Sequence, residues 1–176
     1  MSGHNKFSKI KHIKAKNDAQ KSKLFGKLVR LITVEAKKAK GILTSPGLAN
    51  AIEKAKQENM PNDTIDRAIK KALTDNSAQM EQVLYEAYGP GGVAILISGL
   101  TENRNKAAQE VKHILSNHNI ELAGQGSAAW AFEKTNEGWK ATTTVPLEDS
   151  DIENLSKLVE ELEDNDEVQD VYTNAE

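Results

Sequence analysis

Residues 83–115 read VLYEAYGPGGVAILISGLTENRNKAAQEVKHIL, and this stretch decides the fold of the second half of the chain. Apolar and polar side chains alternate over residues 83–88, residues 89–92 are glycine and proline, and residues 93–100 are almost continuously apolar. Alternation, a turn signal and a buried run together predict two strands joined as a hairpin. Residues 103–117 open with an asparagine, a favoured N-cap residue, and repeat apolar side chains at helical spacing.

Downstream of this stretch the pattern continues with more strands and a second helix. Strands are predicted over residues 128–133, 140–146 and 168–172, and a helix capped by Asp151 is predicted to run to Glu163. The resulting order β-β-α-β-β-α-β predicts an α+β domain, with a ferredoxin-like antiparallel sheet and two helices on one of its faces.

Upstream of residue 80 the pattern is helical. Asn17 and Gln20 form a capping-box signal at the start of a helix that Gly41 is expected to end. Two more helices are predicted to begin at Ser45-Pro46 and at Met60-Pro61, which gives a three-helix bundle over residues 17–73. We therefore expect three parts: a basic arm over residues 1–16, a helical domain with its linker over residues 17–80, and an α+β domain over residues 81–176.

The charge changes sign at the same boundary. Residues 1–80 hold 17 Lys/Arg and 7 Asp/Glu, a net charge of +10, whereas residues 81–176 hold 6 Lys/Arg and 19 Asp/Glu, a net charge of −13. The whole-chain value of −3 conceals this contrast. Two parts of opposite charge are expected to have different partners.

The composition also argues against several classes of protein. The chain has no cysteine, which excludes disulfides, thiolate metal sites and a cysteine nucleophile. No apolar run is long enough to cross a bilayer, and no signal peptide is evident, so we expect a cytoplasmic protein without a membrane partner. The histidines and acidic residues lack metal-ligand spacing, and no pair of side chains has the context of an acid–base site. The sequence therefore predicts neither catalysis, nor a cofactor, nor a bound metal.

The strongest functional signal is the cationic front of the chain, where residues 1–40 contain 12 Lys/Arg and two acidic residues. Such a segment is suited to neutralising phosphates, and interspersed aromatic and imidazole rings can stack on exposed bases. The alternative is a solvated lysine-rich surface without a ligand. The predicted nucleic-acid-binding residues are His4, Lys6, Phe7, Lys9, Lys11, His12, Lys14, Lys16, Lys23, Lys27 and Arg30. We see no helix with base-reading side chains at the appropriate spacing, which favours RNA over DNA.

Arg104 is a further candidate, because it lies in the first turn of the helix predicted over residues 103–117. A cation there opposes the helix dipole, which a purely structural helix would avoid, so Arg104 is predicted to contact a ligand.

Two glycine-rich segments are expected to have structural roles and not to bind phosphate. Residues 89–92 are expected to form a hairpin turn, and residues 124–129 resemble a dinucleotide fingerprint but precede a strand, where that motif requires a helix.

Several motifs resemble the YebC family, which includes the mitochondrial translational activator of cytochrome c oxidase. They include Met1–Phe7 (MSGHNKF), Asn59-Met60-Pro61, Tyr88–Gly92 (YGPGG) and Asn103-Arg104-Asn105. The resemblance implies a non-enzymatic, cytoplasmic, nucleic-acid-associated protein. Some members are described as DNA-binding transcriptional regulators, whereas others act on the ribosome near its peptidyl-transferase centre and relieve stalling on proline-rich stretches.

By analogy, the arm would contact ribosomal RNA of the large ribosomal subunit, and tRNA is a further candidate partner. Promoter DNA is the alternative target, and an adaptor that docks a basic protein on its acidic face is a third hypothesis. The chain departs from the family in one large feature: residues 134–139 form only a short joint where members usually carry a third α/β lobe. The sequence leaves the oligomeric state open.

Overall fold

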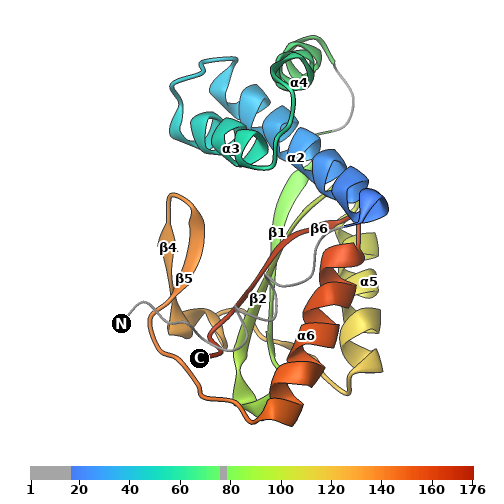
Figure 1. Ribbon diagram of the computed structural model, residues 1–176, viewed down its shortest axis with the longest axis vertical. Coiled ribbons are helices and arrows are strands. Elements are labelled where there is room, and N and C mark those ends of the chain that lie inside the picture. Colours follow the sequence, from blue (N-terminus) through green and yellow to red (C-terminus); the bar gives the residue numbers. More distant parts are fainter. Residues whose placement is uncertain (1–16, 76–78) are drawn as a thin grey trace. The chain divides into compact units, whose positions relative to one another are not determined.

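The computed structural model describes residues 17–75 and 79–176, which form two compact units that divide between Met80 and Glu81 (Figure 1). Each unit has its own hydrophobic core. None of the helices in the described ranges is long and apolar enough to cross a membrane.

The first unit consists of three helices, α2 (Asp18–Ala39), α3 (Pro46–Gln57) and α4 (Asn62–Thr74). The apolar stripes of these helices meet in one core, because their side chains recur every three to four residues and therefore share a face. The buried members of this core include Leu28, Ile32, Ala36, Leu48, Ala51, Ile65, Ala68 and Ile69. The predicted bundle is confirmed.

The predicted ends of α2 are confirmed as well. The Asn17 side chain accepts a hydrogen bond from the Gln20 amide at 2.9 Å, and the Gln20 side chain accepts one from the Asn17 amide at 3.0 Å. At the other end Lys40 and Gly41 both have positive φ, at 50° and 79°, and this left-handed backbone ends the helix. Near the end of α4, Leu73 is 52% exposed and lies outside this core.

The second unit is built on a four-stranded sheet with the order β3-β1-β2-β6, in which every neighbouring pair is antiparallel. Strands β1 (Glu81–Tyr88) and β2 (Ala94–Thr101) pair along their whole length. The expected turn joins them as a short 3-10 helix, η1 (Pro90–Gly92), and the Gly89 amide donates a 2.9 Å hydrogen bond to the Val93 carbonyl. The outer strands are β3 (Leu122–Ala123) and β6 (Val168–Thr173).

Helices α5 (Arg104–Asn117) and α6 (Asp149–Asp164) cover one face of this sheet (Figure 1). Their apolar stripes pack on the alternate strand residues that point the same way, such as Ala87, Ile95 and Ile97. The opposite face packs against the hairpin of β4 (Phe132–Thr135) and β5 (Gly138–Ala141) and against η2 (Ala129–Ala131). The α+β class and the antiparallel sheet with two helices on one face are confirmed.

Two of the predicted strands need correction. Residues 128–133 were expected as a strand of the sheet, but they form η2 and the start of β4, and β4 pairs with β5 in a separate two-stranded sheet. Residues 140–146 were also expected as a strand, but β5 ends at Ala141, and Val145 makes only an isolated parallel bridge to Ala175. The short strand β3 was not predicted.

The start of α6 is also corrected. Asp151 was expected to cap this helix, but α6 begins at Asp149 after the N-cap residue Glu148, and Asp151 lies in the first turn. An acidic side chain in the first turn still favours the helix through its dipole. The apolar stripe of Ile152, Leu155 and Leu158 is buried.

Candidate nucleic-acid interface

The arm that dominates the sequence prediction lies outside the described residues. This applies to the predicted binding residues His4, Lys6, Phe7, Lys9, Lys11, His12, Lys14 and Lys16. The described part of the predicted interface therefore consists of α2 and of the junction between β2 and α5.

On α2, the three predicted binding residues differ in exposure. Lys23, Lys27 and Arg30 are spaced by four and three residues, so they lie along one side of the helix. Lys23 is exposed and Arg30 is half-buried, but Lys27 is only 8% exposed. Of the three, Lys23 therefore offers a polyanion the most surface and Lys27 the least.

The helical unit carries further exposed cations that the sequence prediction did not single out. They are distributed over α2, α4 and the helix ends, and the exposed ones include Lys21, Lys38, Lys40, Lys56, Arg67, Lys70 and Lys71. Lys38 makes an ion pair of 3.5 Å with Glu35 on the preceding turn. This dispersed arrangement can hold an extended backbone of phosphates without reading bases.

In the second unit (residues 81–176, called the α/β unit below), Arg104 follows the N-cap of α5. The Asn103 side chain accepts a 3.1 Å hydrogen bond from the Lys106 amide, which confirms the predicted cap. Arg104 is exposed, and its Nη1 lies 3.0 Å from Glu81 Oε2 at the start of β1. This ion pair offsets the unfavourable position of a cation at the helix N-terminus.

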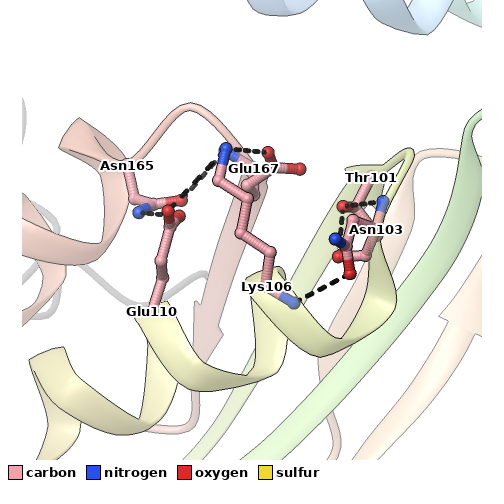
Figure 2. Close-up of polar contacts among 6 residues, drawn as sticks. All are labelled: Thr101, Asn103, Lys106, Glu110, Asn165 and Glu167. Atoms are coloured by element: carbon pink, nitrogen blue, oxygen red, sulfur yellow. Dashed lines mark hydrogen bonds and ion pairs between the residues drawn. The ribbon is translucent and has the colours of Figure 1, made fainter.

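A polar network surrounds this junction (Figure 2). The Lys106 ammonium lies 3.3 Å from Glu167 Oε1 and 3.9 Å from Glu110 Oε1. The Asn165 side chain donates a 2.9 Å hydrogen bond to Glu110 Oε2 and accepts one of 2.9 Å from the Glu167 amide. These contacts tie the N-terminal turns of α5 to the loop between α6 and β6.

Glu167 is the buried member of this network, with 7% of its surface exposed. One carboxylate oxygen is held by Lys106, whereas the other, Oε2, is buried and accepts no hydrogen bond from residues 17–75 or 79–176. Burial raises the pKa of the neighbouring Tyr85, the Arg104 guanidinium opposes this rise, and the Glu167 carboxylate adds to it. The junction is thus a tightly coupled group of charges at one end of the sheet.

A second arrangement of polar groups lies on the sheet face opposite the helices. The Glu86 carboxylate, on the central strand β1, is 4% exposed. It accepts hydrogen bonds from the amides of Gly126 at 2.6 Å, Ala128 at 3.0 Å and Ala129 at 2.7 Å. Burial raises the pKa of Glu86, but the three amide donors together outweigh it and leave the pKa below its ordinary value of 4.5.

The loop held by Glu86 presents Trp130, which is 60% exposed. The Trp130 indole nitrogen donates a 2.8 Å hydrogen bond to the Tyr88 hydroxyl, and that hydroxyl donates in turn to the Ser127 carbonyl. Sequence reasoning did not select these residues, because residues 124–129 were considered only as a phosphate-binding motif. The available signal was a carboxylate, Glu86, between Tyr85 and Ala87 in the mostly apolar second half of the strand.

Comparisons with known proteins show matches over nearly the whole chain. The model described as the TACO1/YebC protein N-terminal domain matches residues 5–75. The model described as the TACO1/YebC second and third domain matches residues 80–137 and 134–175. The break in the second match falls at the β4–β5 hairpin, where the sequence analysis locates a missing lobe.

Three similar curated relatives share one name. A "probable transcriptional regulatory protein" of Fervidobacterium nodosum is 37% identical over 235 aligned positions, which cover 99% of this chain and 93% of the relative. Proteins of the same name from Petrotoga mobilis and Thermosipho africanus are 43% and 36% identical and are covered over 70% and 94% of their lengths. Because 235 positions exceed the 176 residues of this chain, the first alignment includes long gaps in it.

A solved structure shows the same fold. The crystal structure of a conserved hypothetical protein from Aquifex aeolicus superimposes with a TM-score of 0.76 and 31% sequence identity, and the match covers 95% of each chain.

Proposed function

Because this chain belongs to the TACO1/YebC family, we propose that it is a nucleic-acid-binding regulatory protein that acts on translation through ribosomal RNA. Its target is the large ribosomal subunit, where it relieves stalling, for example on proline-rich stretches. It acts in the cytoplasm by binding and positioning RNA or tRNA, without bond chemistry of its own.

The observation that carries this proposal is the segregation of charge. The net charge of +10 lies in residues 1–80, and exposed lysines and arginines extend from α2 to α4. Each cation that reaches a phosphate releases condensed counterions, which gives affinity without dependence on base sequence. The net charge of −13 in the second unit disfavours bulk binding of polyanions there. The basic end is therefore the anchor.

Support for RNA comes from the dispersed cations of the helical unit. A helix that reads the DNA major groove presents Arg, Asn or Gln side chains from its N-terminal turns. The first turns of α3 and α4 carry Pro46-Gly47-Leu48 and Asn62-Asp63-Thr64, in which Asn62 is the one side chain of these types and no cation is present. Recognition of RNA by shape and backbone does not need such a helix.

Promoter DNA is the second candidate target, and the relatives favour it. The relatives compared above are named probable transcriptional regulatory proteins. A DNA-binding regulator would use the same cationic surface on duplex phosphates, and it would differ in requiring a preferred sequence.

A salt titration of the purified full chain tests the anchor. With about six phosphate contacts, affinity for RNA is expected to fall roughly a thousandfold between 50 and 200 mM salt. The double variant Lys11→Gln/Lys14→Gln should flatten this salt dependence, whereas the control Lys112→Gln/Lys157→Gln makes the same charge change in the acidic unit and should leave it unaltered. Equal effects of the two double variants would contradict an anchor in the basic end.

A partition experiment separates the two targets. Action on translation would be supported if the parent protein co-sediments with large ribosomal subunits and the Lys11→Gln/Lys14→Gln variant does not. A footprint on promoter DNA that survives RNase, without ribosome association, would support the transcriptional alternative. Absence of binding to ribosomes, RNA and DNA at low salt would refute both.

A further inference from the structure

We propose that the exposed ring of Trp130 is a stacking site for an unpaired nucleobase, in a unit whose net charge argues against binding phosphates. This inference rests on the proposed binding of nucleic acid and assigns part of it to the α/β unit. It is carried by the orientation, rigidity and electrostatic surroundings of the Trp130 ring.

The orientation of the ring is fixed through its polar edge. The Trp130 indole N–H is already bonded to the Tyr88 hydroxyl at 2.8 Å, so the polar edge needs no further partner. The side chain is nevertheless 60% exposed, and Tyr88 beside it is 40% exposed. A tryptophan whose N–H is satisfied within the protein and whose ring remains in solvent presents its π-face, which is the part that stacks on bases.

The rigidity of the site comes from Glu86 beneath it. Three amide donors of the loop, from Gly126, Ala128 and Ala129, converge on the buried carboxylate of this central-strand residue. The neighbouring Ala128 and Ala131 are completely buried, so they anchor both ends of the short turn that carries Trp130. A preorganised platform loses little conformational entropy when a ligand stacks on it.

The electrostatic surroundings suit an uncharged ring. The segment from Gly124 to Phe132, GQGSAAWAF, contains no charged residue. The acidic residues of this unit are concentrated instead between Glu148 and Glu167, in and around α6, which lies on the other face of the sheet (Figure 1). A lysine-rich peptide would need acidic residues beside the tryptophan, whereas a neutral base does not.

Polar side chains on the same loop can contact the edge of a stacked base. Gln125 and Ser127 are both exposed and supply amide and hydroxyl groups with donors and acceptors. Because stacking is tolerant of base identity, the expected ligand is a single-stranded segment with limited sequence preference. A base-paired duplex, whose bases are already stacked on one another, would not bind there.

The test uses the full chain with Trp139→Phe, which leaves Trp130 as the single tryptophan. Single-stranded oligoadenylate should quench the Trp130 fluorescence, whereas an abasic strand of equal length should bind without quenching. Replacement of Trp130 by Ala should weaken binding of the oligoadenylate roughly 5- to 150-fold at unchanged salt dependence. Replacement by Phe, which keeps an aromatic face, should restore much of the affinity.

The outcomes separate this inference from the proposed function. If Trp130→Ala binds single strands as tightly as the parent while Lys11→Gln/Lys14→Gln loses affinity, the stacking site is refuted and the basic anchor stands. If no oligonucleotide binds at 50 mM salt, both fail. Quenching by a proline-rich peptide, but not by single strands, would refute the nucleobase and indicate a peptide-binding site. Circular dichroism of each variant checks that the fold is retained.

Discussion

The Trp130 indole nitrogen donates a 2.8 Å hydrogen bond to the Tyr88 hydroxyl, from a loop to the end of a strand 42 residues earlier in the chain. Tyr88 is the last residue of β1, and its hydroxyl also donates to the Ser127 carbonyl of the same loop. One phenol oxygen thus holds both the side chain and the backbone of the exposed loop.

Replacement of Tyr88 by Phe removes both hydrogen bonds and keeps the ring. In the Trp139→Phe background, we expect faster local motion of the Trp130 side chain, measured as a loss of fluorescence anisotropy. The cost in unfolding free energy should stay near 1 kcal/mol, because the bonds are solvent-exposed. A matched Tyr85→Phe variant, on the helix-covered face of the same strand, should leave the anisotropy of Trp130 unchanged.

The Glu86 carboxylate is expected to matter more for stability than any exposed acid of this unit. Glu86→Gln keeps the shape but replaces a charged acceptor of three amides by a neutral group with one acceptor oxygen. We expect a loss of about 2–3 kcal/mol in urea unfolding, since hydrogen bonds to charged groups are the strong ones. Glu133→Gln, an exposed site on β4, should change stability by less than about 0.5 kcal/mol.

The lowered pKa of Glu86 also predicts a pH dependence. A carboxyl whose pKa is lower in the folded state stabilises the fold fully above its unfolded value of about 4.5, and this contribution disappears as the pH falls through the folded pKa. The stability difference between the parent and Glu86→Gln should therefore be constant from pH 7 to about pH 5 and shrink below pH 4.5. A difference that stays constant down to pH 2 would contradict the ionised state of Glu86.

The elements that the sequence predicted well are those held by local patterns. Helix α2 follows from the spacing of Leu28, Ile32 and Ala36 and from the Asn17–Gln20 capping box, all within one segment. The β1–β2 hairpin follows from alternation around the glycine-rich turn. Each of these signals lies within about twenty residues, so tertiary structure has little opportunity to override it.

The errors arose where a distant group competes for the backbone. Residues 128–133 have strand-like composition, but the Glu86 carboxylate binds the amides of Ala128 and Ala129 from 42 and 43 residues away. Those amides are then unavailable for a strand ladder, and the chain turns before β4 begins. The Arg104–Glu81 ion pair also joins residues far apart in the sequence. The sequence therefore showed that Arg104 is a cation in the first turn of a helix, but not that Glu81 is its partner.

Gly99 occupies the position where β2 and β6 shift register. A Cβ atom on this residue would lie 2.5 Å from the Glu167 carbonyl oxygen and 3.1 Å from Val83 Cγ2. Relief of the first clash requires a shift of the backbone, because the Glu167 oxygen belongs to the main chain. Gly99→Ala is expected to destabilise this unit by about 1–3 kcal/mol in urea unfolding followed by tryptophan fluorescence. Gly124→Ala, whose Cβ would lie at an ordinary contact distance of 3.5 Å from Ser127 Oγ, should be much milder.

The ion pair of Arg104 with Glu81 gives opposite predictions for its two members. Both side chains are largely exposed, so breaking their 3.0 Å contact should cost at most about 1 kcal/mol of stability. If Arg104 contacts a phosphate, Arg104→Gln should weaken RNA binding and reduce the salt slope by about one, whereas Glu81→Gln should strengthen binding by removing a competing anion. The matched pair Lys157→Gln and Glu153→Gln, from an exposed ion pair of 3.2 Å on α6, should leave affinity unchanged. If the Arg104 and Glu81 variants bind RNA in filter-binding assays as tightly as the Lys157 and Glu153 variants do, Arg104 has a purely structural role.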